Sequence, residues 1–240
     1  IVAISTVSGG SATEDGTQSV TITINEDETA PVVNLSINNS SIAENSDGTI
    51  TVTATLSFAT IINTTVVIDT SGTATEGTDY GSISDITITA GNTTGTATFD
   101  PTDDSVYEGN ETATISIASV VGADAGSTTS QTITITDNES APTVTLATSA
   151  TSIAENAGSS LTLTATLSVA TTADVTVGIS TSGTGTEGTD YATISDITIS
   201  AGATTGTASF TPTDESIFEG NETGIVAIDT VSGGSATEDG

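Results

Sequence analysis

Two short acidic segments carry most of the chemistry that this sequence offers. Each places four carboxylates close together along the chain: Asp103, Asp104, Glu108 and Glu111 in the first, and Asp214, Glu215, Glu219 and Glu222 in the second. The chain contains no Lys, Arg or His to neutralise them. A folded cluster of hard oxygen ligands without nitrogen or sulfur favours calcium. The alternative interpretation is an acidic, solvated loop.

The net charge of the chain narrows its possible partners. The formal charge is -31, from 31 acidic residues and no basic ones, so nucleic acid and anionic membrane surfaces are excluded as partners. No apolar run is long enough to predict a membrane span in this segment. No signal peptide is visible, and we expect the chain to be a mature or excised piece of a longer protein.

The residue types also argue against an enzyme. Without Cys, His or Lys, the usual nucleophiles, general bases and zinc ligands are absent, and the redox compartment is undetermined. Carboxylate pairs act as acid and base in glycosidases. Such sites bind sugars beside aromatic side chains, and this chain has only three Tyr and four Phe. We therefore predict no catalytic residues and no organic cofactor.

The chain repeats itself at two periods. The short period places Ser41–Asn45 on Ser152–Asn156 and Thr75–Tyr80 on Thr186–Tyr191. The long period, about twice the short one, places Ile1 to Gly16 on Ile225 to Gly240, and only Ser5 and Asp229 differ. The simplest account is a window cut from a longer tandem array. We predict the end of one domain at 1–30, a whole domain at 31–141, and a domain lacking its last strand at 142–240.

The hydrophobic pattern predicts strands and no helices. Apolar residues alternate with Thr or Ser over 50–58 and 161–169, which is typical of half-buried strands. Shorter alternations give about seven strands per repeat, with Gly and Asn between them. Seven short antiparallel strands in a repeat of this length predict a β-sandwich. Proline after Ala30 and Ala141 predicts short, semi-rigid junctions.

Two motifs in order resemble the Calx-beta repeat. Gly72–Tyr80, with its Thr-Glu-Gly-Thr-Asp-Tyr ending, is followed by the acidic segment Asp103–Glu111. The resemblance covers 31–141 and nearly all of 142–240. It implies an all-β fold of tandem seven-stranded immunoglobulin-like sandwiches, with Ca²⁺ bound at one end of each.

The resemblance also implies the calcium ligands. In the first repeat they are Glu44, Asp79, Asp103, Asp104, the Val106 carbonyl, Glu108, Glu111, Asp137 and Asn138. In the second repeat they are Glu155, Asp190, Asp214, Glu215, Ile217, Glu219 and Glu222. Glu26 and Asp27, after Asn25, would close the site of a preceding domain.

The sequence departs from the family pattern at two of these positions. Asn138 interrupts a run that is often all aspartate, and Glu215 has a longer side chain than Asp104, its counterpart. Other recurring residues have plainer interpretations. Glu76 and Asp85, with their counterparts Glu187 and Asp196, are interpreted as solvated charge. Tyr80 and Phe99, with Tyr191 and Phe210, are interpreted as core anchors.

Three functions agree with these observations. The first is a structural segment of an extracellular or cell-surface filament or adhesin stalk, in which calcium stiffens the domains and their junctions and neighbouring copies of the repeat are the partners. The second is a calcium-sensing module. The third is a carbohydrate-binding or cell-adhesion module, which requires an exposed aromatic platform. Filaments visible in native material would favour the first.

Overall fold

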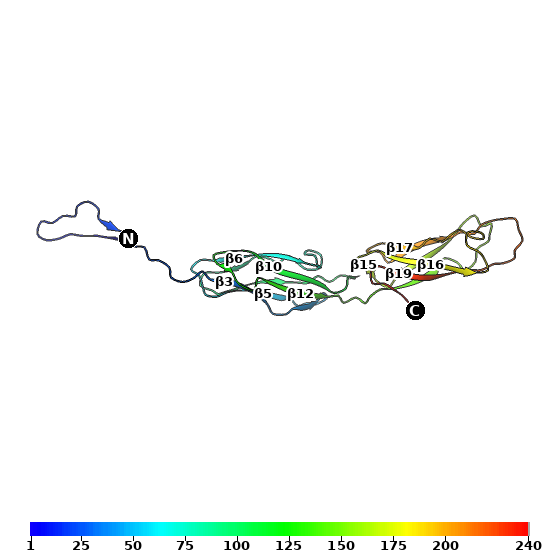
Figure 1. Ribbon diagram of the computed structural model, residues 1–240, viewed down its shortest axis with the longest axis horizontal. Helices are drawn as coiled ribbons and strands as arrows, with labels where there is room; N and C mark the ends of the chain where they lie inside the picture. The colour runs from blue at the N-terminus through cyan, green and yellow to red at the C-terminus, as the bar shows by residue number, and fades with distance from the viewer. Residues whose placement is uncertain (240) are drawn as a thin grey trace.

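The computed structural model describes residues 1–239, which are built of strands without a helix. An N-terminal arm leads into two β-sandwiches that lie end to end (Figure 1). This confirms the predicted all-β fold. Since the described residues form no helix, none is long and apolar enough to span a membrane.

The first sandwich consists of a five-stranded and a four-stranded sheet. One sheet has the order β4-β12-β10-β6-β7 and the other β11-β3-β5-β8. Their strands are β3 (Val32–Ile37), β4 (Ser41–Ala43), β5 (Ile50–Leu56), β6 (Thr64–Gly72), β7 (Ile86–Ile88), β8 (Thr94–Phe99), β10 (Glu111–Val121), β11 (Asp124–Ala125) and β12 (Ser130–Thr136). A further short strand, β9 (Val106–Tyr107), lies outside both sheets.

The core of this sandwich follows the alternation in the sequence. Ile50, Val52 and Leu56 of β5 are buried, while the threonines between them are more exposed. Burying such side chains stabilises the fold by about 1.5–3 kcal/mol each. Tyr80 and Phe99 are fully buried and stack with ring centroids 4.8 Å apart. Their interpretation as core anchors is confirmed.

The second sandwich repeats this arrangement with fewer strands. Its sheets have the orders β18-β14-β13-β20 and β17-β16-β19. The strands are β13 (Thr143–Thr148), β14 (Leu161–Leu167), β16 (Val175–Gly183), β17 (Ile197–Ile199), β18 (Thr205–Phe210), β19 (Gly224–Ser232) and β20 (Thr237–Glu238). The short β15 (Ala170–Thr171) pairs in parallel with β9 of the first sandwich. Within the described residues, no strand lies on the outer side of β19.

The N-terminal arm has little regular structure. Its only strands are β1 (Val2–Ala3) and β2 (Ser19–Val20), which pair with each other. The segment 22–24 has the same Ile-Thr-Ile sequence as part of β12 but is not a strand here. Among the described residues it pairs with no strand, so no ladder accepts its backbone hydrogen bonds.

Asp85 and Asp196 have a structural role that the sequence analysis did not predict. The pairing of β6 with β10 shifts register next to Ile68, and the Asp85 carboxylate accepts the Ile68 N–H at 3.0 Å. Asp196 accepts the Ile179 N–H at 3.1 Å beside the matching shift in the second sandwich. These carboxylates satisfy backbone donors that the irregular ladder leaves free. Their interpretation as purely solvated charge was wrong.

Gly72 provides a test of how closely the strands approach below the acidic end of the sandwich. Its φ is +134°, and a Cβ added there would lie 2.0 Å from the Thr112 carbonyl oxygen. We expect Gly72→Ala to lower the free energy of unfolding of the first sandwich by more than about 3 kcal/mol, measured by urea denaturation.

Gly77→Ala is the matched control for that substitution. Gly77 also has a positive φ, +88°, but a Cβ there would meet no atom within 4 Å. Gly77→Ala should therefore lower the free energy of unfolding only by the cost of a non-glycine residue in the left-handed region, about 1–2 kcal/mol. Equal losses for the two variants would contradict the role of the close approach to Thr112.

Candidate metal centre

The acidic end of the first sandwich forms where several strands begin or end together. β4 and β12 run in parallel and pair Ala43 with Thr136, so the next residues, Glu44 and Asp137, emerge side by side. β10 runs antiparallel to β12 and begins at Glu111. The sheet topology therefore gathers carboxylates that lie far apart in the sequence.

Two groups of carboxylates result. Glu44, Asp137 and Glu139 form one group, the Glu44 cluster, and Asp79, Glu108 and Glu111 form the other, the Asp79 cluster. Within each cluster the carboxylate oxygens lie within 4.8 Å of one another. Oxygens bound to one Ca²⁺ at about 2.3–2.6 Å lie within about 5 Å of each other. The spacing of both clusters therefore fits a shared cation.

Asp137 connects the Glu44 cluster to the acidic segment. Its Oδ2 accepts backbone N–H groups from Glu108 (2.9 Å) and Gly109, and its Oδ1 accepts the Glu139 N–H at 2.8 Å. Burial alone would raise the pKa of Asp137, but these three backbone donors lower it below its ordinary value. Asp137 is therefore held ionised at the centre of the site.

The backbone around Asp79 holds this carboxylate in place. Its Oδ2 accepts the Thr75 N–H at 2.6 Å, and its own carbonyl accepts the Thr102 N–H at 2.9 Å. The next residue, Tyr80, is buried in the core and stacks on Phe99. The Asp-Tyr pair thus joins a ligand position to a core anchor, which fixes where the carboxylate points.

Three carboxylates of the site, those of Glu44, Glu108 and Glu111, have strongly raised pKa values. Burial, followed by a hydrogen bond to Glu139 and the charges of Asp137 and Glu139, raises the pKa of Glu44 to about 8. Burial and the charge of Asp79 raise the pKa of Glu108 and of Glu111 to about 7 each. Without a cation, Glu44 would be mostly protonated at neutral pH, whereas Glu108 and Glu111 would be divided between the protonated and the charged form.

The donor set therefore fits calcium. All of its ligand atoms are oxygens, the clusters are partly buried, and the chain has no positively charged side chain to pair with them. In the second sandwich, Glu215 Oε1 is buried with no hydrogen-bond partner. A buried carboxylate oxygen without a partner is costly unless a cation or proton satisfies it.

The remaining predicted ligands of the first repeat lie around these clusters. Asp104 is exposed, accepts the Val106 N–H at 2.7 Å, and acts through its charge on Glu44 and Glu108. Asp103 is exposed and belongs to neither cluster. The side-chain amide of Asn138 faces the carboxylates of Glu44 and Glu139, and its nitrogen would donate to Glu44 Oε1 at 2.7 Å if the amide is turned to place that atom there.

The sequence analysis missed one member of the site, Glu139. It completes the Glu44 cluster two residues after Asp137. A signal was present, because Glu28 stands at the same position one repeat earlier. Glu139 lies three residues after the end of β12, so the strand pattern does not indicate it as a ligand. The turn after β12, in which Asp137 accepts the Glu139 N–H, places its carboxylate in the cluster.

A comparison with known families identifies the domains. A family model described as the Calx-beta domain matches residues 26–139 and 137–238. The chain belongs to the Calx-beta family. The predicted resemblance is thereby confirmed. No curated protein matches the chain.

Solved structures similar to this chain are also Calx domains. The apo form of a Calx CBD1 domain is 21% identical, with 46% of this chain and 100% of that chain covered and a TM-score of 0.40. CBD12 from CALX1.2 is 20% identical, with 75% and 74% covered and a TM-score of 0.41. The calcium binding domain CBD12 of CALX1.1 is 19% identical, with 73% of each chain covered and a TM-score of 0.38.

The second Calx-beta domain has one of the two carboxylate clusters found in the first. Asp190, Glu219 and Glu222 form a cluster that matches the Asp79 cluster. Glu155 accepts the Glu215 N–H at 3.1 Å, and Glu215 accepts the Ile217 N–H at 2.6 Å. Asp214 is exposed and outside the cluster.

The charges in this second cluster also repel one another. The pKa values of Glu219 and Glu222 are raised, by partial desolvation first and then by the charge of a neighbouring carboxylate, Glu215 for the former and Asp190 for the latter. A counterpart of the Glu44 cluster is not present among the described residues of this domain. The carboxylates of Glu26, Asp27 and Glu28 form an exposed group of their own in the N-terminal arm.

Proposed function

We propose that this chain is a calcium-binding structural segment of an extracellular filament or adhesin stalk built from tandem Calx-beta domains. Glu44, Asp79, Glu108, Glu111, Asp137 and Glu139 would hold the ions in the first domain, and Glu155, Asp190, Glu215, Glu219 and Glu222 in the second. When bound, calcium would supply the positive charge that these clusters lack. Membership of the Calx-beta family, whose tandem domains bind calcium, supports the calcium part of this proposal.

The observation that carries the proposal is the contact between the acidic segment and the next domain. β9 lies inside the segment, between Asp104 and Glu108, and pairs in parallel with β15. Thr171 of β15 is buried. Glu108, a ligand position, directly follows this strand, and Asp104 before it acts on Glu108 through its charge, so the state of the clusters would determine whether the strand is held in place.

Calcium would therefore stiffen the junction between domains. Without it, repulsion among Asp104, Glu108 and Asp137, acting within a screening length of about 10 Å, would loosen the segment that carries β9. We expect straight two-domain particles in calcium and bent ones in chelator, with each sandwich still folded. Small-angle scattering and electron microscopy of the same sample measure this difference.

A control separates stiffening by calcium from general charge effects. Glu76→Gln removes one exposed charge whose carboxylate accepts only the Thr70 hydroxyl at 2.8 Å, so it should leave the calcium response unchanged. Glu108→Gln should weaken it. Equal bending with and without calcium in the unmodified chain would show that the ions do not brace the junction. The calcium-sensing alternative predicts a large change of shape within one domain instead.

A further inference from the structure

The sheet edges of the first Calx-beta domain differ in length. β4, β7 and β11 end their sheets with three, three and two residues, whereas β8 ends its sheet with six, Thr94–Phe99. All four strands lie within residues 26–139, which one copy of the family model matches, so these edges are set inside the domain. Very short edge strands protect a sheet from pairing with another chain. β8 does not have this protection.

β8 also lacks the other features that protect sheet edges. Its sequence, Thr-Gly-Thr-Ala-Thr-Phe, has no charged residue and no proline, and its ladder with β5 runs without a register shift. By contrast, Asp124 lies in β11, Asp85 directly precedes β7 and Glu44 directly follows β4. In a chain with 31 acidic residues and no basic ones, a charge-free edge is where two copies can approach with the least repulsion.

The backbone of β8 presents hydrogen-bonding groups along its outer edge. The Leu56 N–H donates to the Thr93 carbonyl at 2.8 Å. Because bonding alternates along an antiparallel ladder, every second residue of β8 from Gly95 onward bonds to β5. The residues between them are exposed and have backbone groups that point away from β5: Thr94, Thr96 and Thr98. No strand of the described residues pairs on that side of β8, so the edge can accept a further strand.

β7 of the facing sheet packs against the inner face of β8 and not along its edge. A Cβ added at Gly95 would lie 2.7 Å from the Thr87 carbonyl oxygen of β7. The glycine therefore lets the two sheets approach closely at this corner of the sandwich. β7 forms no ladder with β8, so this contact leaves the outward backbone groups of β8 free.

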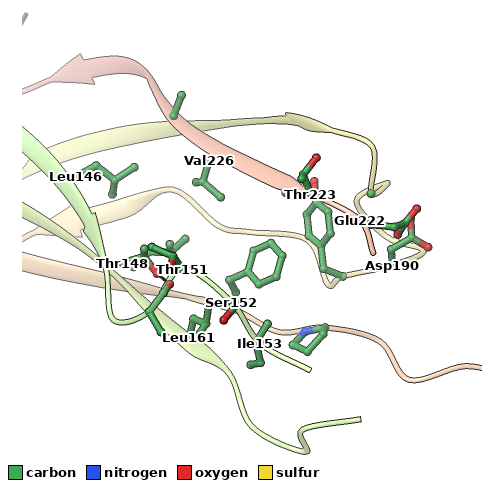
Figure 2. A pocket seen from close by; sticks show the side chains of 18 of the residues that line it. Leu146, Thr148, Thr151, Ser152, Ile153, Leu161, Asp190, Glu222, Thr223 and Val226 are labelled. Carbon is green, nitrogen blue, oxygen red and sulfur yellow. Dashed lines mark hydrogen bonds between the residues drawn. The ribbon is translucent and has the colours of Figure 1, made fainter. Parts of the chain in front are cut away.

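The second domain repeats this edge. β18, Thr205–Phe210, ends its sheet and has the sequence Thr-Gly-Thr-Ala-Ser-Phe. Leu161 of β14 and Val226 of β19 line the space between the two sheets (Figure 2). Thr205 and Thr207, which alternate with the inward residues of β18, are exposed. The charge-free edge is therefore a property of the repeat and not of one domain.

We propose that β8 is a docking edge at which a second copy of this chain adds its own β8 in antiparallel orientation. The register centres on Thr96, which lies opposite its own copy, with Thr94 opposite Thr98. Each hydrogen-bonded pair of residues in such a ladder exchanges two backbone hydrogen bonds. The two copies of the sheet β11-β3-β5-β8 join into one, and the contact is two-fold symmetric.

The residues at the two ends of β8 favour the antiparallel orientation. Asp100 directly follows the strand, and Asn92, which is exposed, lies two residues before it. In the proposed register Asp100 of one copy lies opposite Asn92 of the other, and the two Asp100 residues are about 26 Å apart along the strand. A parallel pair would place the two Asp100 carboxylates side by side, without a cation between them.

The joint connects chains side by side. The strands of both sandwiches run along the long axis of the molecule (Figure 1), so antiparallel pairing holds two chains alongside each other and pointing in opposite directions. This contact goes beyond the proposed function, in which domains meet along the axis, and it does not use the calcium clusters. A chain that stays monomeric but gains thermal stability from calcium would overturn the joint alone. A chain that pairs through β8 but shows no response to calcium would overturn the proposed function alone.

The first experiment compares proline with valine at the centre of the edge, by sedimentation velocity over a range of concentrations. Both edges are changed together because β18 has nearly the same sequence. Thr96→Pro with Thr207→Pro removes an outward N–H at each site and keeps the ladder inside the domain, so the association constant should fall at least about tenfold. Thr96→Val with Thr207→Val keeps the N–H and should change it less than about threefold. An unmodified chain that stays monomeric, or equal association of the two variants, would overturn the joint.

A second pair of variants tests the edge without changing the backbone. Thr96→Asp with Thr207→Asp places two carboxylates across the two-fold axis and should weaken association at least about tenfold. Thr55→Asp with Thr166→Asp adds the same charges to exposed residues on the same sheet faces, one strand further from each edge. There the charges of the two copies are separated by more than the screening length of about 10 Å, so association should be nearly unchanged. Equal weakening by both pairs would overturn docking at the edge.

The third experiment determines the register. The chain has no cysteine, so Thr96→Cys alone should give a disulfide-linked dimer on mild oxidation, because hydrogen-bonded partners lie about 5.5 Å apart. Thr94→Cys alone is the matched control, since its own copy would lie four residues away, about 13 Å along the strand. Thr94→Cys combined with Thr98→Cys should link again. If Thr94→Cys alone links as fast as Thr96→Cys, the proposed register is wrong.

Discussion

Calcium should raise the melting temperature of the first Calx-beta domain by about 10–20 °C. A ligand that binds only the folded state at a hundredfold above its dissociation constant contributes about 2.7 kcal/mol. For a domain of this size, each kcal/mol corresponds to about 4–8 °C. The second domain, which lacks a Glu44-type cluster among its described residues, should gain less. Differential scanning calorimetry with calcium and with chelator measures both transitions.

Glu108→Gln should shift the melting temperature of the first domain in opposite directions in chelator and in calcium. In chelator the variant should melt higher than the unmodified chain, because one of three crowded carboxylates becomes neutral. In calcium it should melt lower, because a charged ligand is lost. Glu76→Gln removes the same charge outside the clusters and should shift neither value by more than about 1–2 °C. An unchanged melting temperature on adding calcium would contradict the calcium site.

The metal-free chain should lose stability as the pH rises from about 5 to about 8. Glu44, Glu108 and Glu111 have pKa values raised from an ordinary 4.5 to about 8, 7 and 7. In that window the folded state binds protons that the unfolded state has already released, so raising the pH favours unfolding. We expect the melting temperature in chelator to fall by at least about 5 °C across it. Asp137, whose pKa is lowered from 3.8, acts only below the window.

Calcium should remove this pH dependence. Metal binding requires deprotonated carboxylates and releases their protons, so the calcium-loaded chain should be as stable at pH 8 as at pH 6. Glu44→Gln should flatten the profile in chelator, and Glu76→Gln should not. A metal-free chain that becomes more stable from pH 5 to pH 8 would show that these carboxylates are not crowded in the folded state.

The strands were predictable because their signal is local. The alternation over 50–58 and the buried face of β5 agree, since side chains on a strand point to opposite faces in turn. Tyr191 and Phe210, interpreted as core anchors like Tyr80 and Phe99, stack as that pair does: the ring centroids lie 4.7 Å apart in the second domain and 4.8 Å apart in the first.

The grouping of the carboxylates was not predictable in the same way. Glu44 and Asp137 lie at opposite ends of the first domain's sequence, and they meet because β4 and β12 pair in parallel. Glu139 joins them through a turn that no periodicity reveals. Asp103, which stands in the densest run of acids, lies exposed outside both clusters. A dense run of acidic residues in the sequence therefore does not identify which carboxylates cluster in the fold.

Composition and repetition alone determined that this chain is acidic, without side-chain cations, all-β and built of copied units. These properties depend on residue types and on neighbours along the chain. The tertiary structure decided which carboxylates share a cluster and that β9 touches the next domain. Those outcomes depend on which strands pair, and pairing is set by burial across the whole sandwich.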